Sequence, residues 1–443
     1  MLRMPVIFIY FLLYSVASSS QNKTALLNKE DLLFLKQITR SVIDSSRIFP
    51  KQEITDFGAN NTGGTLIRPG GRNAYPSFWI RDYAMSLETG FITAAEQKHM
   101  LLLTASTQCD QTWITKNGSM VPYGAIADHI RIDNSLPIYY PGTYSYEEQG
   151  EKTFGMMPPY CDQFYFIHMA HYYILTSGDI SMLTKEINGT RLIDRLEVAF
   201  NVPPSRTNNH IVYTTDAFRG VDFGFRDAEE ITGDLCFASL LKYQAANQLS
   251  GLFVKLKLFA KASKYKHIAS SIKKALGGLF ADERGMLHAS TGKSKQADVW
   301  STALAVYLGV LEGDTLTKAC STLNNAYIKG TLAYKGNIRH ILTTDDFNTN
   351  TAWEISLAAK NEYQNGAYWG TSTGWVCYAI AKVNESAAKE LAKAFIDDLR
   401  ENDFRKGGEA AAPYECFYPP SHKQNPLYMT TVACPYVVFK KEK

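Results

Sequence analysis

Helical periodicity recurs along most of this 443-residue chain, and it constrains the fold more than any other feature of the sequence. The clearest case is the stretch "KEDLLFLKQITRSVIDSS", in which apolar residues repeat at the spacing of one helix face. Further helices are expected at roughly 79–93, 96–114, 162–177, 179–199, 231–249, 252–262, 264–280, 298–311, 314–327, 348–361, 369–382, 386–401 and 427–438. Strand-like runs such as "HIVYTT" are short and few. The sequence therefore predicts an all-α fold.

Short turns and long loops alternate between the expected helices. The long loops fall at 49–78, 118–161, 201–230, 283–297 and 403–426, and they are rich in glycine, proline and aromatic residues. This alternation indicates paired helical hairpins, and in a barrel of such hairpins the long loops gather on one face and form a pocket there. A stacked helical-repeat solenoid is the alternative, but it would show a fixed sequence period, and none is visible.

The N-terminus has the layout of a signal peptide. A positive charge near the start precedes an apolar run from Val6 to Val16, which small residues follow. The run is short for a membrane span, so we expect a signal peptide over 1–20 and a single exported domain, secreted or periplasmic, over 21–443. An uncleaved membrane anchor is the alternative interpretation.

Net charge and cysteine content argue against several classes of protein. With 46 Lys and Arg against 43 Asp and Glu, the net charge of +3 predicts neither a nucleic acid nor a membrane surface as partner. The seven cysteines contain no C-x-x-C, which argues against a zinc ribbon, and the one disulfide considered is Cys416–Cys434. His168 and His171 lie one helix turn apart without a third ligand at diagnostic spacing, so no metal or other cofactor is expected.

The stretch "YPSFWIRDYAMSLETG" carries the first candidate site residues. Trp79, Arg81 and Asp82 fall where a helix is expected to begin, directly after a loop. Arg81 and Asp82 together can donate to and accept from neighbouring hydroxyl groups of a sugar, while Trp79 offers a ring face. A surface ion pair beside a core tryptophan is an equally good interpretation of the same residues.

The stretch "TTDAFRGVDFGFRDAEEITGDLCFASLL" is rich in acids. Asp222 is enclosed by glycine, valine and phenylalanine, and an apolar environment raises the pKa of a carboxyl group, as a general acid requires. An Asx-turn within a glycine loop is the other interpretation of Asp222. Asp227, Glu229 and Glu230 lie at an expected helix start, where acids favour the helix dipole. Whether Asp222 or one of these neighbours is the acid stays open.

Two further segments combine polar and aromatic residues around expected helix starts. "KQADVWSTALAVYLG" contains Asp298 and Trp300, and Asp298 also fits a plain helix N-cap. "YQNGAYWGTSTGWVCYAIA" contains Tyr368, Trp369 and Trp375 around three glycines. Both segments are typical of surfaces on which sugars stack, so these residues are candidate substrate contacts.

The stretch "AAPYECFYPP" places Glu415 among two tyrosines, a phenylalanine, a cysteine and three prolines. A buried carboxylate costs several kcal/mol unless it is paired or functional. A carboxylate flanked by aromatic rings at the mouth of a cavity is a common need of sugar chemistry. Glu415 is therefore the second candidate for a catalytic acid or base.

These motifs resemble those of the six-hairpin glycosidases, especially the group that contains trehalase and the processing α-glucosidases. "RGVDFGFRD" resembles the trehalase-type acid loop E-S-G-W-D-F-S-x-R-W, and "APYECFYPP" resembles the E-x-Y-x-P pattern around the catalytic base. The resemblance implies that Asp222 is the catalytic acid and Glu415 the catalytic base.

Two more motifs extend the resemblance to glucoamylase-like enzymes. "FWIRDYAM" is similar to their W-x-R-D element, which binds the terminal sugar, and "NGAYWGTSTGW" looks like the aromatic segment that lines the same cup. The resemblance implies an (α/α)6 barrel, a six-hairpin toroid whose long loops form a pocket on one face.

The expected function is that of an exported, metal-independent, exo-acting glycoside hydrolase that removes a terminal sugar from an oligosaccharide. Inversion is expected, with Asp222 protonating the leaving oxygen and Glu415 activating water across a separation of roughly 6.5–9.5 Å. One alternative is a polysaccharide lyase or unsaturated-uronide hydrolase on a helical toroid, and a lyase would need a Tyr/His or Arg/His pair. Another is a glycan-binding relative without activity. The sugar, its anomer, its linkage and the oligomeric state are left open.

Overall fold

The computed structural model of the chain describes residues 25–70 and 75–442. Within these ranges the secondary structure is mainly α-helical, which confirms the predicted helical class. The expected signal peptide at 1–20 lies outside the described residues. In the part of the chain that is described, no helix combines the length and the apolar character needed to cross a membrane.

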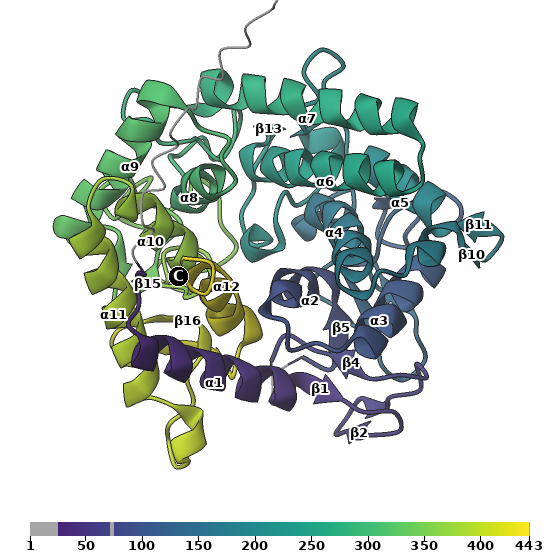
Figure 1. Cartoon of the computed structure of the whole chain (residues 1–443), viewed down its shortest axis with the longest axis horizontal. Helices are drawn as coiled ribbons and strands as arrows, with labels where there is room; N and C mark the ends of the chain where they lie inside the picture. Colours follow the sequence, from purple (N-terminus) through teal and green to yellow (C-terminus); the bar gives the residue numbers. More distant parts are fainter. Residues whose placement is uncertain (1–24, 71–74, 443) are drawn as a thin grey trace, which may run out of the picture.

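The helices form two concentric layers (Figure 1). The inner layer consists of α2 (Ile80–Ser86), α4 (Tyr160–Ser177), α6 (Cys236–Lys255), α8 (Val299–Tyr307), α10 (Thr373–Ala381) and α12 (Met429–Phe439). The outer layer consists of α1 (Lys29–Ser46), α3 (Ala94–Ser106), α5 (Leu192–Asn201), α7 (Phe259–Phe280), α9 (Gly313–Ile328) and α11 (Glu385–Glu401). The inner helices contact one another in a cycle, from α2 through α4, α6, α8, α10 and α12 back to α2. Outer helices pack against this cycle, as α7 does on α6, α11 on α10 and α1 on α12.

The two layers differ in how their residues are patterned. Every residue of α12 is buried, and α8 is buried along all but its last residue, because both helices are covered on every side. The outer helix α11 instead buries one stripe, which includes Leu391, Phe395 and Leu399 at helical spacing, and it exposes Lys and Glu on the other face. This pattern gives the helical periodicity that is visible in the sequence.

Small strands and short 3-10 helices occupy the connections. The strands are β1 (Arg47–Ile48), β2 (Glu53–Ile54), β3 (Gly58–Ala59), β4 (Leu66–Ile67), β5 (Ser77–Trp79), β6 (Trp113–Ile114), β7 (Met120–Val121), β8 (His129–Arg131), β9 (Pro137–Ile138), β10 (Glu186–Ile187), β11 (Thr190–Arg191), β12 (Tyr213–Thr214), β13 (Gly233–Asp234), β14 (Ala333–Tyr334), β15 (Asn337–Ile338), β16 (Tyr414–Tyr418) and β17 (His422–Pro426). The 3-10 helices are η1 (Leu87–Thr89), η2 (Lys152–Phe154), η3 (Ile180–Thr184), η4 (Asp216–Phe218), η5 (Gly224–Arg226) and η6 (Phe404–Lys406). The sheet β5–β8–β9 and the antiparallel hairpin β16–β17 are the ones that bear on the candidate site.

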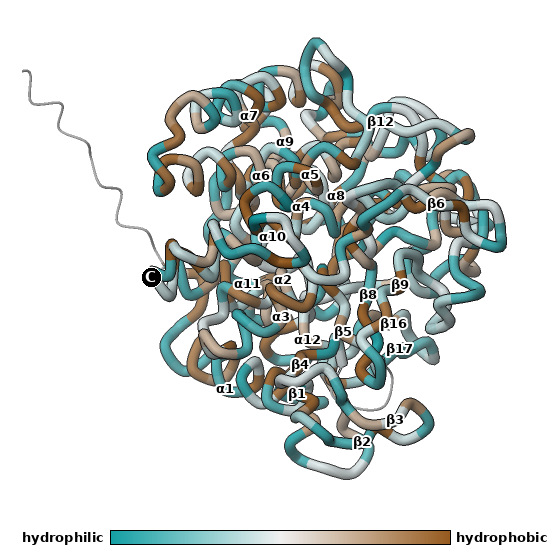
Figure 2. The backbone as a smooth tube through the Cα atoms, turned by 90° about the vertical axis from the view of Figure 1, so that its right-hand side faces the viewer, coloured by the Kyte–Doolittle hydropathy of each residue, from teal (hydrophilic) through white to brown (hydrophobic). Residues whose placement is uncertain are grey.

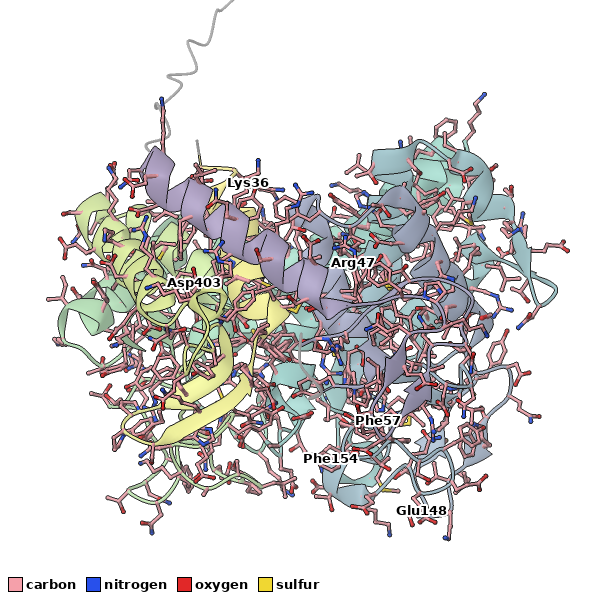
Figure 3. The ribbon with its side chains drawn as sticks, turned by 90° about the horizontal axis from the view of Figure 1, so that it is seen from below. Lys36, Arg47, Phe57, Glu148, Phe154 and Asp403 are labelled. Atoms are coloured by element: carbon pink, nitrogen blue, oxygen red, sulfur yellow. The ribbon has the colours of Figure 1, made fainter. Side chains whose placement is uncertain are left out.

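The long connections lead from an outer helix to the next inner helix. They cover 47–79, 107–159, 202–235, 281–298, 329–372 and 402–428, and five of them overlap the loops expected from the sequence. Figure 2 shows β6, β8, β9, β16 and β17 on the side of the molecule away from the C-terminus. In Figure 3, Phe57, Glu148 and Phe154 lie in the lower half of the view, as does the yellow hairpin β16–β17.

Three of the expected helices are wrong, and one of them, 179–199, is interrupted by the hairpin of β10 and β11 before α5 begins. No helix forms at 348–361, because asparagine side chains take the backbone N–H groups that a helix would need. Asn348 Oδ1 accepts from the backbone N–H of Asn350 and Thr351, and Asn365 Oδ1 accepts from that of Ala352. The expected helix at 252–262 is divided between α6 and α7, because Lys257 adopts a positive φ of 57° in the turn between them.

The disulfide Cys416–Cys434 is also wrong. All seven cysteines lie in the described part of the chain, and each is a buried free thiol. Cys416 faces Gln424 across the hairpin, with Sγ 3.8 Å from Oε1, whereas Cys434 lies against the backbone carbonyl of Met85. The two side chains therefore meet different parts of the fold.

Candidate active site

A cavity of about 470 Å³ lies among the long connections and above the first residues of α2 and α12. Its walls come from the connections that precede α2, α4, α6, α10 and α12 and from the start of α2. The lining residues are Pro69, Tyr75, Trp79, Arg81, Asp82, Pro141, Gly142, Thr143, Tyr144, Phe154, Gly224, Phe225, Asp227, Ala228, Leu357, Ala358, Tyr363, Glu415, Gln424 and Tyr428. The volume falls in the range of small-molecule binding pockets. Of the expected long loops, 283–297 contributes no residue to this described lining.

Glu415 lies on β16 and is 1% exposed, although it lines the cavity. Its Oε2 accepts hydrogen bonds from Tyr75 Oη at 2.9 Å and from Asn425 Nδ2 at 2.5 Å. Burial raises the pKa of Glu415 to about 7, the charges of Asp82 and Asp227 act in the same direction, and the two hydrogen bonds only partly oppose them. The carboxyl group therefore titrates close to neutral pH.

Asp227 directly follows η5 and faces the same cavity. Its Oδ1 accepts a hydrogen bond from Gln364 Nε2 at 2.8 Å, and Gln364 Oε1 accepts one from the backbone N–H of Ala228 at 2.8 Å. Gln364 thus fixes both the carboxylate and the backbone beside it. Burial raises the pKa of Asp227 to about 6, against the opposing charge of Arg81.

Asp82 lies in the first turn of α2 and lines the cavity. Tyr428, the residue that precedes α12, donates from its Oη to Asp82 Oδ1 at 2.7 Å. Burial raises the pKa of Asp82 to about 6, while Arg81 and the Tyr428 hydroxyl oppose the shift. This contact joins the first inner helix of the chain to the last one at the cavity.

Arg81 is the centre of a group of carboxylates. Its guanidinium binds Asp128 Oδ1 through Nη1, which also lies 3.8 Å from Asp162 Oδ2. Its Nε lies 3.9 Å from Asp82 Oδ2, and its Nη2 lies 4.0 Å from Asp227 Oδ2. Burial opposes the charge of Arg81, but the surrounding carboxylates outweigh it and raise the pKa of Arg81 well above its usual value. Arg81 is therefore a fixed positive charge beneath two of the cavity acids.

Gly224 is required for this arrangement. A Cβ atom at position 224 would lie 1.9 Å from Nε of Arg81, so only glycine lets the backbone before Asp227 approach the guanidinium. The glycine that the sequence shows inside "VDFGF" is thus explained by close packing on Arg81.

Trp79 forms one wall of the cavity. Its ring stacks on His129, with centroids 4.2 Å apart and planes 13° apart, and it meets Tyr75 edge-on at 5.0 Å. Trp79 pairs with His129 across the β5–β8 ladder, which holds both rings in register. The wall is therefore built from backbone pairing and ring stacking together.

The structure brings four of the candidate residues, Trp79, Arg81, Asp82 and Glu415, to one cavity. It does not bring Asp222 there. Asp222 Oδ2 forms an ion pair with Arg226 Nη2 in the interior.

The reason is the turn of η5, which separates Asp222 from Asp227. Asp222 points inward to Arg226, whose other terminal nitrogen, Nη1, binds Asp298. Asp227 emerges at the far end of the turn and lines the cavity. Burial raises the pKa of Asp222 as well, with the Arg226 charge opposing it, but this carboxyl group has no access to the cavity lining.

Asp298 and Trp300 also lie in the interior. Asp298 is the N-cap of α8 and accepts from the backbone N–H groups of Trp300 and Ser301 at 3.0 and 3.1 Å, which is the plain capping role. Trp300 is fully buried and stacks on His340 with centroids 3.9 Å apart. Neither residue lines the cavity.

The expected aromatic contacts at 368–375 are likewise not on the cavity. Trp369 is fully buried and donates from Nε1 to the backbone carbonyl of Tyr363 at 3.2 Å. Tyr368 stacks on Tyr418 at 5.7 Å, and Trp375 lines a separate cavity of about 70 Å³ between the inner helices. These three rings are buried and do not line the cavity.

Glu229 and Glu230, the other acids considered for catalysis, have structural partners. Glu229 accepts from Ser356 Oγ at 2.9 Å, and Glu230 pairs with Lys293 at 2.6 Å. Neither residue belongs to the described cavity lining. Asp227 is therefore the member of this acidic segment that the fold delivers to the cavity.

Several contacts of the site were not singled out from the sequence. Tyr75 and Tyr428 donate to the two acids Glu415 and Asp82, and Gln364 donates to Asp227. Tyr75 lies within the quoted stretch "YPSFWIRD", and Gln364 lies in "YQNGAYWG", so both had a signal in their neighbours. The sequence around Asp128 gives no such signal, because its contact with the site depends on where Arg81 lies in the fold.

The residues described here include no group of three His, Cys, Asp or Glu side chains arranged to hold a metal ion. His168 is buried and bonded through Nδ1 to Gln248 Nε2 at 2.8 Å, and burial lowers the pKa of His168 to about 4.

No protein-family model and no curated protein matches the chain. Among solved structures, the glucoamylase from Saccharomycopsis fibuligera is similar, with a TM-score of 0.58 and 10% identity over 96% of this chain and 97% of the glucoamylase. A GH78 family rhamnosidase of Bacillus sp. GL1 has a TM-score of 0.53 and 10% identity over 93% of this chain and 34% of its own. An α-L-rhamnosidase from Aspergillus terreus has a TM-score of 0.52 and 10% identity over 91% of this chain and 39% of its own.

The chain thus spans little more than a third of each rhamnosidase but almost all of the glucoamylase. At 10% identity these similarities concern the fold, and they confirm the predicted glucoamylase-like architecture at that level.

Proposed function

We propose that this protein is an exo-acting, inverting glycoside hydrolase on an (α/α)6 barrel, in which Asp227 is the general acid and Glu415 the general base. The observation that carries the proposal is that two buried carboxyl groups with raised pKa values, from connections far apart in sequence, face one cavity. Perturbed carboxyl groups that share a cavity are typical of catalytic sites. Inverting hydrolysis needs one such group protonated and the other ionised.

The hydrogen bonds support this division of roles between the two acids. Both donors to Glu415, the hydroxyl of Tyr75 and the amide of Asn425, bind the same oxygen, Oε2, and favour the ionised form. Oε1 carries no hydrogen bond in the described part of the chain, which leaves it for the attacking water. Glu415 has the higher pKa of the two acids, so the assignment follows the donors and not the order of acidity.

Asp227 is suited to carry a proton. Its Oδ1 is occupied by Gln364, while Oδ2 lies 4.0 Å from Arg81, beyond hydrogen-bonding distance. Oδ2 can therefore hold the proton that the leaving oxygen receives. Once either Asp227 or Glu415 ionises, its charge raises the pKa of the other, so near neutral pH the pair favours one proton.

The remaining polar groups support binding of a terminal sugar. Asp82 and Arg81 offer an acceptor and donors at the base of the cavity, and Trp79 offers a ring wall. Asp82 and Tyr428 join the starts of α2 and α12 beneath the cavity, which suits the end of an oligosaccharide better than its middle. The proposal includes export through residues 1–20 and one catalytic domain over 21–443.

The lyase alternative has less support. A lyase of this kind needs a Tyr/His or Arg/His pair, and no histidine belongs to the described lining of the cavity. Burial and the neighbouring Glu415 charge raise the pKa of Tyr75 well above its usual value, so Tyr75 is a donor and a poor base. A binding protein without activity would have no need for two acids that titrate near neutral pH.

The test is to incubate the protein with a panel of oligosaccharides and follow the released sugar by proton NMR within minutes. We expect a monosaccharide product that first appears with its anomeric configuration inverted. Glu415→Gln should abolish most of the release, whereas Glu409→Gln, an exposed change in the same connection, should not. A retained anomer would contradict the single displacement, and internal cleavage products would contradict exo action.

A further inference from the structure

The guanidinium of Arg81 makes unequal contacts with the carboxylates around it. In the part of the chain that the structure describes, its one hydrogen bond runs from Nη1 to Asp128 Oδ1. Asp162 lies 3.8 Å from Nη1, and Asp227 lies 4.0 Å from Nη2, so neither is a hydrogen-bonding partner. Arg81 therefore binds Asp128, which does not line the cavity. It forms no hydrogen bond with Asp227, which lines the cavity.

Asp128 is itself held firmly. Its Oδ2 lies 2.8 Å from His129 Nδ1, and its backbone carbonyl accepts from the N–H of Ile80 at 3.2 Å. His129 is fixed in turn, because its ring stacks on Trp79. Burial acts to raise the pKa of Asp128, but the charges and hydrogen bonds of Arg81 and His129 outweigh it and hold the net pKa below its usual value.

Gly224 closes the other side of Arg81. Because a Cβ at position 224 would lie 1.9 Å from Nε of Arg81, the backbone that leads to Asp227 rests directly on the guanidinium. Arg81 is thus confined between this backbone and Asp128. A small displacement of its Nη2 by about 1 Å would bring Asp227 into hydrogen-bonding range.

We propose that Asp128 is a positioning residue of the active site, which binds Arg81 and so keeps Arg81 out of hydrogen-bonding contact with Asp227. This inference rests on the proposed role of Asp227 as the general acid. An acid that formed a close ion pair with arginine would ionise at low pH and lose the proton that the leaving oxygen needs. Asp128 therefore preserves the acid without touching the substrate.

The charged and titratable groups around the two partners act together. Those that face Arg81 are Asp82, Cys161 and Asp162 in addition to Asp128 and Asp227. Those that face Asp227 are Arg81, Asp128, Glu229, Tyr363 and Glu415. In this set, Asp128 is the carboxylate that both neutralises Arg81 and adds its own negative charge near Asp227. Both effects favour the protonated form of Asp227.

The experiment compares Asp128→Asn with Asp162→Asn. Both variants replace a buried aspartate beside Arg81, but Asp162 Oδ2 lies 3.8 Å from Nη1 of Arg81, so replacing Asp162 removes no hydrogen bond to the guanidinium. The titration of Asp227 is followed by carbon NMR of protein labelled at the aspartate carboxyl groups, with Asp227→Asn to assign the signal. We expect the Asp227 midpoint to fall by about one pH unit or more in Asp128→Asn and to move clearly less in Asp162→Asn.

Activity gives a second readout. The descending limb of the pH–rate profile should move to lower pH in Asp128→Asn, while the ascending limb stays in place. Asp128→Glu retains the charge and should restore the limb toward its original position. If Asp128→Asn does not fold, Asp128→Ser removes the same charge and leaves room for water.

The two readouts separate the positioning role from the proposed function. An unchanged Asp227 midpoint in Asp128→Asn, or an equal shift in Asp162→Asn, would overturn the positioning role. A shifted midpoint in a protein that hydrolyses no glycoside would support the contact and reject the proposed function.

Discussion

Arg81 and Arg226 are both buried arginines that bind carboxylates, but Arg81 lines the cavity and Arg226 does not. Arg226, Asp222 and Asp298 form the core cluster, in which Arg226 pairs with both acids in the interior. Arg81 instead pairs with Asp128 and forms no hydrogen bond with Asp82 or Asp227, which lie 3.9 and 4.0 Å from its nitrogen atoms. The core cluster ties the turn at η5 to the N-terminus of α8, so its role is structural.

The cavity cluster consists of Arg81, Asp82, Asp128 and Asp227. Its two cavity acids, Asp82 and Asp227, have pKa values raised by burial to about 6 and keep an open face toward the cavity. Acids that are buried but not fully paired are expected where protons are moved, whereas paired acids are expected where the fold is fixed. The partner of a carboxylate therefore tells more about its role than its burial does.

The largest expected effect separates the two aspartates of one loop. Asp227→Asn should lower turnover by roughly 10²–10⁴-fold with the fold intact, because a proton-transfer group is lost. Asp222→Asn should leave turnover per folded molecule within a few-fold of the original. Turnover is measured on samples whose folded fraction is known from circular dichroism. Similar losses in both variants would remove the distinction between the clusters.

The free energy of unfolding should fall more in Asp222→Asn than in Asp227→Asn, the reverse of the order expected for turnover. Asp222→Asn leaves Arg226 with one partner in the interior, and breaking a buried ion pair costs about 3–5 kcal/mol. Asp227→Asn removes no close ion pair, since Arg81 is 4.0 Å away, and should cost far less. Urea unfolding of both variants measures the difference. A more stable Asp222→Asn variant would show that the core cluster does not hold the fold.

Glu415→Gln should change stability in a manner that depends on pH. The pKa of Glu415 is about 7 in the folded protein against an ordinary 4.5, so folding favours its protonated form. The contribution of protonated Glu415 to the free energy of unfolding is fully present below pH 4.5 and is lost as pH rises through 7. At pH 8 the loss amounts to about 3 kcal/mol. Glu415→Gln should therefore be more stable than the parent at pH 8 and equal to it at pH 4.

The matched control for that change is Glu53→Gln, which lies exposed on β2. Its effect on the free energy of unfolding should be small and the same at both pH values. A Glu415→Gln variant that shows no gain at pH 8 would contradict the strong desolvation of Glu415.

Tyr428→Phe should have a moderate effect on catalysis. The change removes the hydroxyl that donates to Asp82 at 2.7 Å and keeps the ring. A hydrogen bond to a charged group contributes about 1.5–3 kcal/mol, so kcat/KM should fall roughly 10–100-fold. Tyr418→Phe is the control, because the Tyr418 ring stacks on Tyr368 away from the cavity lining. Equal kcat/KM values for the two variants would place Asp82 outside substrate binding.

Chelation should have no effect. Sugar hydrolysis by an acid and a base uses no Lewis acid, and the sequence offers no cluster with zinc spacing. Activity is assayed after dialysis against a chelator. Loss of activity that returns on addition of calcium or zinc would contradict the proposed chemistry.

Much of the fold could be predicted from local patterns. The helix expected at "KEDLLFLKQITRSVIDSS" forms as α1 over the same residues, because its apolar stripe and its N-cap Asn28 are both local features. The expected helix at 348–361 failed for a reason that is only partly local, because Asn348 does accept from the backbone N–H groups of its neighbours Asn350 and Thr351. Asn365 accepts from backbone N–H groups of the segment only after the chain has folded back on it.

The candidate site was predictable where its residues stand at a loop-to-helix junction. Trp79, Arg81 and Asp82 are adjacent in sequence and remain adjacent in the cavity. The sequence could not tell which of Asp222 and Asp227 faces the cavity, because both lie among similar neighbours. What holds Asp222 in the interior is Arg226, which also binds the distant residue Asp298. Long-range packing decides which acid faces the cavity, and one sequence does not contain that information in its local pattern.

The most direct test of the central claim compares leaving groups in Asp227→Asn and Glu415→Gln. Aryl glycosides with strongly acidic leaving groups need no protonation, so they bypass a general acid but not a general base. We expect Asp227→Asn to recover most of its turnover on such substrates, while Glu415→Gln stays inactive on them. Recovery in Glu415→Gln alone would reverse the roles, and recovery in Asp222→Asn in place of Asp227→Asn would contradict the assignment of the acid to the cavity cluster.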